Sequence, residues 1–143
     1  TRLLLENTAG QGSALGFEFE QLQAMSERSE VSDRLGVCID TCHAFAAGYG
    51  LHTGEEWDAL LEKLDATVGL ARVEALHLND SKHPQGSRRD RHESIGEGHI
   101  GDAAFARIVS EERLKGVPMV LETPLGDDEL GHQRDLERLR SLL

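Results

Sequence analysis

LGVCID, at residues 35–40, is an apolar run that ends in an acid, and a helical pattern follows it through CHAFAAGYG at 42–50. A short apolar run, a polar residue and then a helix are typical of one β/α unit. The charged and apolar residues of 54–69, GEEWDALLEKLDATVG, predict a further helix after Thr53. The same order recurs elsewhere in the chain, which makes this unit the pattern of the whole fold.

Three other apolar runs end in polar residues, and a loop and a helical pattern follow each of them. Their helical patterns cover residues 17–27, 102–112 and 133–143. Strands that alternate with helices predict parallel β/α units, and four such units fit the 143 residues as one α/β domain. The three runs are RLLLE (2–6), RVEALHLND (72–80) and VPMVLET (117–123).

Metal-ligand residue types stand at corresponding places in the four runs. Alternate residues of a strand face one side, so Glu6, Asp40, His77 and Glu122 can share one face at the carboxyl ends of the strands. Active sites of α/β folds lie at this end. Carboxylates and imidazoles suit zinc, manganese or iron, and three close carboxylates repel one another without a cation. A single strand-end acid is typical of a helix cap, but four together predict a metal site.

DRHESIGEGHIG, at 90–101, lacks an apolar stripe and is interpreted as a loop that holds side chains in position. Taken alone, it is compatible with a solvated polar loop. His43 follows Asp40 by three residues, however, and Asp90 and His92 lie two apart in this loop. Beside the first set, His43, Asp90 and His92 indicate a second group of ligands.

Charge and composition limit the classes of function. The formal net charge of −11 argues against a nucleic-acid partner, unless several acids bind cations. The stretch 81–91, SKHPQGSRRDR, is nevertheless locally basic. No apolar run approaches the roughly 20 residues of a membrane span, and no secretory signal is evident. Because the chain starts at Thr1, we expect a processed product or a piece of a longer protein.

The two cysteines, Cys38 and Cys42, are too few for a disulfide framework in a chain of this length. No second cysteine pair is present to complete a zinc site with them. We therefore expect buried, reduced thiols in a cytoplasmic protein.

Several long motifs resemble the C-terminal half of bacterial endonuclease IV. This family comprises zinc-dependent apurinic/apyrimidinic endonucleases of base-excision repair with a TIM-barrel fold. The resemblance covers essentially the whole chain, and it implies that residues 1–143 form half of a xylose isomerase-like TIM barrel. The motifs are ENTAGQG (6–12), GVCIDTCHAFAAGY (36–49), HLNDSK (77–82), GSRRDRHESIGEGHIG (86–101) and LETP (121–124).

The resemblance also implies the metal ligands. Glu6 resembles the glutamate that bridges two zinc ions, and Asp40, His77 and Glu122 resemble the other ligands of the second zinc. The first zinc of the family also takes two histidines from the N-terminal half, which nothing here matches. Two of the three family sites are therefore expected to be complete in this chain. The ligands implied for the third zinc are His43, Asp90 and His92.

The activity implied by the resemblance is hydrolysis of the phosphodiester 5′ to an abasic site in double-stranded DNA, leaving a 3′-hydroxyl. Glu6 and Glu122 would be the catalytic carboxylates. Four basic residues are candidates for phosphate contacts, although solvated loop charges explain them equally well. They are Lys82, Arg88, Arg89 and Arg91.

Two other functions remain open. Sugar isomerases of the xylose isomerase-like barrels also place Glu, Asp and His around a metal, although they have no need of the His43, Asp90 and His92 group. A non-catalytic metal-binding half-barrel is the other alternative. Half a barrel also leaves its outer strands without neighbours, so we expect a homodimer through these edges and weak or absent incision activity.

Overall fold

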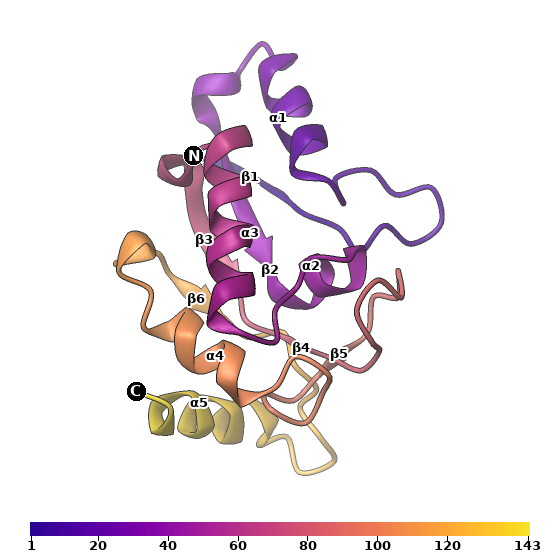
Figure 1. Cartoon of the computed structure of the whole chain (residues 1–143), viewed down its shortest axis with the longest axis vertical. Coiled ribbons are helices and arrows are strands. Elements are labelled where there is room, and N and C mark those ends of the chain that lie inside the picture. Colours follow the sequence, from indigo (N-terminus) through magenta and orange to yellow (C-terminus); the bar gives the residue numbers. More distant parts are fainter.

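A computed structural model describes all residues, 1–143, and its centre is a sheet of four parallel strands in the order β1-β2-β3-β6 (Figure 1). The four strands come from the four predicted runs, so the expected α/β class with parallel units is confirmed. They are β1 (Leu3–Glu6), β2 (Leu35–Asp40), β3 (Val73–His77) and β6 (Met119–Val120).

Five α-helices and a short antiparallel hairpin complete the fold. The hairpin pairs β4 (Asp80–Ser81) with β5 (His92–Glu93), and it lies beyond the carboxyl end of β3. None of the helices has the length and apolar character needed to cross a membrane. The helices are α1 (Phe19–Glu27), α2 (Thr41–Ala47), α3 (Gly54–Thr67), α4 (Asp102–Val109) and α5 (Gly131–Ser141).

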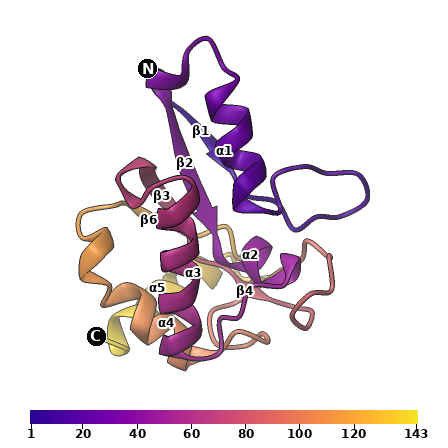
Figure 2. The same ribbon diagram turned by 45° about the horizontal axis from the view of Figure 1, so that its top comes forward.

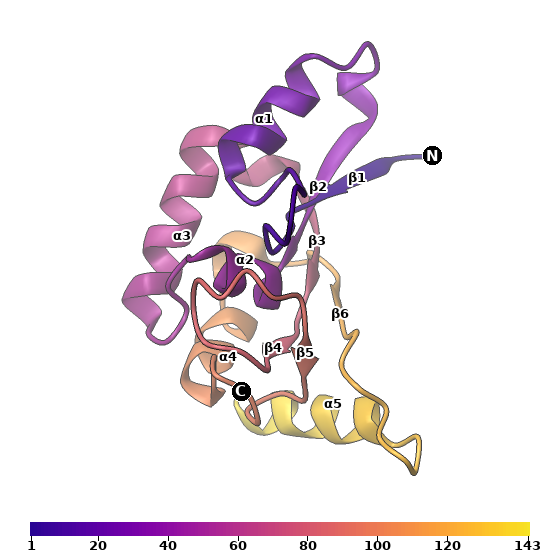
Figure 3. The same ribbon diagram turned by 90° about the vertical axis from the view of Figure 1, so that its right-hand side faces the viewer.

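The hydrophobic core lies between the sheet and the helices on one of its faces. Figure 3 shows α1, α3 and α4 on the same side of the sheet. Ile39 and Leu76 point from the strands into this core, where they join Trp57, Phe45 and Phe105 as fully buried side chains. Burial of large apolar side chains is the main favourable term in folding, so this face holds the domain together.

Local sequence fixes the two helices that flank the end of β2. The Asp40 carboxylate accepts a hydrogen bond from the backbone N–H of His43 at 2.7 Å and thereby caps α2. Gly48 ends the helix with a φ of +119°, a left-handed conformation that glycine adopts without strain. Thr53 and Glu56 form a capping box at the start of α3.

Two of the predicted runs form shorter strands than their apolar patterns indicate. In the run at 72–80, the strand ends at His77, and Asp80 begins the separate hairpin. In the run at 117–123, only Met119 and Val120 pair as β6. Glu122 therefore lies two residues beyond the end of β6. Its backbone N–H donates to the Asn79 side-chain oxygen at 2.9 Å and not to a neighbouring strand.

Neither edge of the sheet is paired with a further strand. β1 and β6 each have one neighbour, and Leu3 and Val120 are 63% and 47% exposed. Figure 2 shows the connection between β1 and α1, residues 7–18, extending away from the body of the fold. Unpaired strand edges can pair with another chain, so the expected incompleteness of the barrel is evident here.

A buried acid joins α3 to the segment after α4. Glu111 is 6% exposed and accepts hydrogen bonds from the indole of Trp57 at 3.1 Å and from Arg113 at 2.8 and 2.7 Å. Arg107 lies 2.9 Å from the same carboxylate. Hydrogen bonding to Arg113 lowers the pKa of Glu111 to about 2, against the smaller opposing effect of burial.

We predict that Glu111→Gln lowers the free energy of unfolding at pH 7 by about 2 kcal/mol, because it leaves buried donors without their anion. The native carboxyl has a lower pKa than in the unfolded chain, so its contribution is full above about pH 4.5 and declines as the pH falls towards 2. Urea unfolding of both proteins at several pH values checks this result.

Glu112→Gln is the matched control. Its side chain is 79% exposed and pairs only with Lys115, so we expect a change within about 0.5 kcal/mol. A difference between wild type and Glu111→Gln that stays constant from about pH 7 to about pH 2.5 would contradict the assignment.

Candidate metal centre

The register of the parallel sheet brings the strand-end ligands together. Asp40 lies opposite His77 in the β2–β3 pair, and Glu6 of β1 lies opposite Cys38 of β2. The Nδ1 atom of His77 lies 3.2 Å from a Glu6 carboxylate oxygen and 3.1 Å from a Glu122 carboxylate oxygen. One donor atom from each of Glu6, Asp40, His77 and Glu122 falls within 4.8 Å of the others, and we call this set group A.

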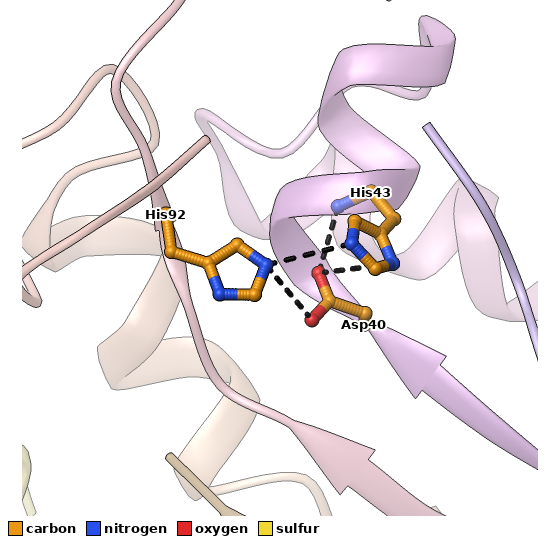
Figure 4. Close-up of side chains that lie close together, drawn as sticks. All are labelled: Asp40, His43 and His92. Atoms are coloured by element: carbon orange, nitrogen blue, oxygen red, sulfur yellow. Dashed lines mark hydrogen bonds and ion pairs between the residues drawn. The ribbon is translucent and has the colours of Figure 1, made fainter. Parts of the chain in front are cut away.

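A second set of ligands meets at the same end of the sheet. Donor atoms of Asp40, His43 and His92 also lie within 4.8 Å of one another, and we call this set group B (Figure 4). The three side chains come from the end of β2, from α2 and from β5. Asp90 lies beside group B, with a carboxylate oxygen 3.2 Å from Nε2 of His43 and 3.5 Å from Nε2 of His92.

Asp40 belongs to both groups. Its side chain has no exposed surface, and one carboxylate oxygen accepts the His43 backbone N–H while the other accepts the Asn79 amide at 2.6 Å. That second oxygen also lies 3.7 Å from Nε2 of His92 and 3.9 Å from Nδ1 of His77. The sequence motifs imply a single site for Asp40, whereas in the structure it lies between the two groups.

Two buried asparagines hold the ligands and were missed by the sequence analysis. The Asn7 side chain accepts the Asp40 backbone N–H at 2.7 Å, and its backbone oxygen lies 2.9 Å from Nδ1 of His43. Asn79 orients Asp40 through its amide and Glu122 through its side-chain oxygen. Both residues follow closely on a strand-end ligand, in ENT and HLN, and this position was the available signal.

The charges around His43 favour a bound cation. Burial disfavours the charged imidazole, but hydrogen bonding to Glu6 and the negative charges of Asp40 and Asp90 raise the pKa of His43 to about 9. Hydrogen bonding to His43 lowers the pKa of Glu6. Burial raises the pKa of Asp40, and the charge of His43 opposes this effect. A cation among these carboxylates would relieve their mutual repulsion.

The donor sets fit a divalent metal ion of the zinc, manganese or iron type, because they combine imidazole nitrogens with carboxylate oxygens. The Asn7 carbonyl near Nδ1 of His43 and the Glu122 carbonyl 3.1 Å from Nδ1 of His92 would leave each Nε2 free to bind. The side chains of Glu6 and Glu122 are 35% and 47% exposed, so group A is open to a ligand from outside.

Both thiols are buried, as expected, but neither joins a ligand group. Burial raises the pKa of Cys38 and of Cys42 to about 12 in each case. Cys42 donates a hydrogen bond to the Arg91 backbone oxygen at 3.5 Å. The cysteines therefore serve packing and support of the 81–101 loop.

The four basic candidates lie on the loop that carries Asp90, and all are exposed. Arg88 is anchored, because its guanidinium stacks 4.6 Å from the centre of the Phe17 ring and its backbone N–H donates to Ala46. Arg91 donates a hydrogen bond to the Asp90 backbone oxygen at 2.5 Å. None of Lys82, Arg88, Arg89 and Arg91 is a member of either ligand group.

The fold agrees with that of a known family. The family described as xylose isomerase-like TIM barrel matches residues 1–142. The chain belongs to this family. The parallel sheet of four strands is therefore a partial barrel of that family, as the sequence motifs predicted.

Relatives within the family agree with the predicted resemblance to endonuclease IV. The chain is 52% identical over 138 residues to the probable endonuclease 4 of Halorhodospira halophila, covering 96% of the chain and 46% of that protein. It is 50% identical over 143 residues to the protein of the same name from Chloroflexus aggregans, covering all of the chain and 50% of that protein. The chain thus spans about half the length of these relatives.

A solved structure gives the same result. Endonuclease IV from Thermus thermophilus superposes with a TM-score of 0.85 and 41% identity, over 98% of this chain and 49% of that one. The likeness therefore extends over all four β/α units and not over a single motif.

We predict that Asp40→Asn weakens divalent-metal binding at both groups by roughly 10-fold or more, because Asp40 is the only ligand they share. The asparagine keeps an oxygen to cap α2, so the helix is retained. Titration of the metal-free protein with Zn²⁺ in a calorimeter measures both affinities.

His92→Ala should weaken group B alone, and Glu55→Gln, at an exposed acid of α3, should change neither group. Loss of affinity at a single group in Asp40→Asn would show that the carboxylate serves only that group.

Proposed function

We propose that this chain is part of a metal-dependent endonuclease of the endonuclease IV type, which hydrolyses the phosphodiester 5′ to an abasic site and leaves a 3′-hydroxyl. The observation that carries the proposal is the pair of ligand groups joined by the buried Asp40 at the carboxyl end of the sheet. The names of the full-length relatives and the Thermus thermophilus structure support the DNA-directed activity.

Zinc is the proposed metal, with one ion in each group. Glu6, Asp40, His77 and Glu122 would hold the first ion. His43 and His92 of group B, with the neighbouring Asp90, would hold the second. Asp40 belongs to both groups, so its carboxylate would also contribute to the second site. Three or four nitrogen and oxygen ligands suit zinc. The first zinc of the family also needs two histidines that nothing in this chain matches, so we propose two ions for this chain.

The residues of the chain would divide the chemistry among them. Bound zinc would supply the positive charge that neutralises the scissile phosphate and makes water more acidic. Glu122, which is half exposed and held by Asn79 through its backbone, would accept a hydrogen bond from the attacking water and direct it to phosphorus. Glu6, which lies next to His43 and His77, would help to hold the metal.

The basic loop would bind the DNA backbone. The exposed cations of Lys82, Arg88, Arg89 and Arg91 lie on the loop that carries Asp90, and phosphate binding by cations needs no base recognition. The stacking on Phe17 would hold the Arg88 guanidinium at one place on this loop.

Buried, reduced thiols agree with a cytoplasmic protein.

Group B separates this function from that of a sugar isomerase of the same family. An isomerase would need the four ligands of group A, whereas nothing in its chemistry calls for His43, Asp90 and His92. A non-catalytic metal-binding half-barrel would use both groups and would differ only in lacking incision.

Two copies of the chain would also complete the sheet. Four strands from each copy give eight, the number in a TIM barrel, with β6 of one copy beside β1 of the other. The exposed Leu3 and Val120 lie on these two edges. We therefore propose a homodimer that covers both edges.

We expect protein purified without chelator to contain about two zinc ions per chain, as required by one ion in each group. Plasma mass spectrometry measures the metal content, and His77→Ala and His92→Ala should each remove one ion. Wild-type protein without metal, even after zinc is added, would contradict the proposed metal centre.

Incision of a DNA duplex with one abasic site should be detectable but slower than incision by the full-length Thermus thermophilus enzyme by roughly 100-fold or more, because an incomplete site misplaces the reacting groups. Gel analysis gives the rate and the 3′-hydroxyl end. Glu122→Gln should abolish the residual cutting. Metal binding with no cutting at any enzyme concentration would favour the non-catalytic module.

Light scattering should give a mass that rises from one copy to two as the concentration increases. Leu3→Lys together with Val120→Lys should keep the chain monomeric, because charges at strand edges oppose pairing. A monomer at all concentrations would exclude the homodimer.

A further inference from the structure

A further buried acid, Asp80, lies one residue after Asn79 and belongs to neither ligand group. Its side chain accepts hydrogen bonds from five backbone N–H groups. One carboxylate oxygen accepts from Ser81 at 2.7 Å and from Ile100 at 2.8 Å. The other accepts from Gly96 at 2.9 Å, Gly98 at 3.1 Å and Gly101 at 3.3 Å.

These contacts explain the glycines of the 96–101 segment, GEGHIG. Gly96 and Gly101 have φ angles of +75° and +84°, in the region that favours glycine. At Gly98, a Cβ atom would collide with the Asp80 carboxylate and would lie 2.5 Å from the Ser81 backbone oxygen. The loop at 96–101 is thus wrapped closely around the Asp80 carboxylate.

The Asp80 carboxylate lies at the start of the 81–101 loop, which carries Asp90 and His92. Asp80 pairs with Glu93 and Ser81 with His92 in the β4–β5 hairpin. The Lys82 N–H donates to the Arg91 oxygen at 3.0 Å, and the His99 N–H donates to the Ser81 oxygen at 2.8 Å. Asp80 therefore joins the beginning of the 81–101 loop to its end.

We propose that Asp80 is a positioning residue for group B: its five hydrogen bonds close the 81–101 loop and thereby hold His92 and Asp90 over Asp40 and His43. The inference rests on the proposed function only for the metal that group B binds. Because a buried carboxylate that accepts hydrogen bonds from many N–H groups forms strong, charge-assisted bonds, it can fix the loop together with the buried side chains of Ile95 and Ile100.

The position of Asp80 predicts a selective effect. His77 and Glu6 are held by strands β3 and β1, and the backbone of Glu122 is held by Asn79. The Glu122 backbone oxygen also contacts the His92 ring, but the carboxylate of Glu122 has no contact with the 81–101 loop. Asp90 and His92 lie within that loop. Loss of the hydrogen bonds to Asp80 should therefore weaken metal binding at group B alone.

The test is Asp80→Asn, which keeps the shape of the side chain but offers one oxygen in place of two. In either orientation of the amide, its NH₂ group faces backbone N–H groups whose hydrogen bonds the carboxylate had accepted, and two donors cannot pair. Calorimetric titration with Zn²⁺ should give a roughly 10- to 100-fold weaker affinity at group B, which is the range for mutation of residues that orient metal ligands. The affinity at group A should be unchanged. His92→Ala and His77→Ala identify the two binding steps.

A spectroscopic measurement separates positioning from general loss of stability. Co²⁺ bound at group B of wild-type protein should give visible absorption bands that are shifted or weakened in Asp80→Asn, while the bands of group A persist. Glu111→Gln, which destabilises the packing between α3 and the segment after α4, should leave both sets of bands and both affinities unchanged. Equal weakening of both groups in Asp80→Asn, or of neither, would overturn the proposal.

A second variant reaches the same contacts from the loop. Gly98→Ala leaves Asp80 intact but introduces the Cβ that collides with its carboxylate, and it should weaken group B to a similar extent. Normal Zn²⁺ affinity at group B in Gly98→Ala and Asp80→Asn together would exclude the positioning role.

Hydrogen exchange keeps this inference separate from the proposed function. In metal-free protein, exchange at the Lys82 and His99 amides should be at least roughly 10-fold faster in Asp80→Asn, because both report closure of the loop. If wild type binds no metal but this acceleration occurs, the proposed metal function fails and the role of Asp80 in holding the loop stands. Unchanged exchange overturns the role of Asp80, whatever the metal result.

Discussion

The buried Asp40 carboxylate accepts the first hydrogen bond of α2 and the amide of Asn79, and it lies at the same time within reach of His77, His43 and His92. A carboxylate without exposed surface is stable only when its oxygens have partners. The start of α2, the end of β3 and the ligands around Asp40 must therefore form together. This constraint links the backbone of the sheet directly to the two proposed ligand groups.

Around Asp40, the proposed metal centre is supported by hydrogen bonds to side chains that belong to neither ligand group. Asn7 and Asn79 fix Asp40 from two neighbouring strands, and Asn79 also places Glu122, whose own strand is only two residues long. Metal sites depend on such partners for the orientation of their ligands. Group A is thus held by the sheet, whereas group B depends on a loop that one buried acid, Asp80, closes.

The parallel fold and the meeting of the strand-end acids and histidine at one edge were predictable because they follow from local rules. A period of two fixes which residues share a face, and parallel strands place their carboxyl ends at one edge, so Glu6, Asp40 and His77 could be assigned from sequence. The shared position of Asp40, the short β6 and the role of Asp80 were not predictable. Each depends on hydrogen bonds between residues distant in sequence, and the glycines around Asp80 indicated only that a turn was present.

All seven proposed ligands belong to four consecutive β/α units of one chain, while the free edges of β1 and β6 are the places where another chain would pair. Metal uptake is then a reaction of a single copy, with a rate independent of protein concentration when metal is in excess. Closure of the sheet by a second copy is bimolecular and becomes slow in dilute solution. The order of events in assembly would consequently be metal first and barrel second whenever the chain is scarce.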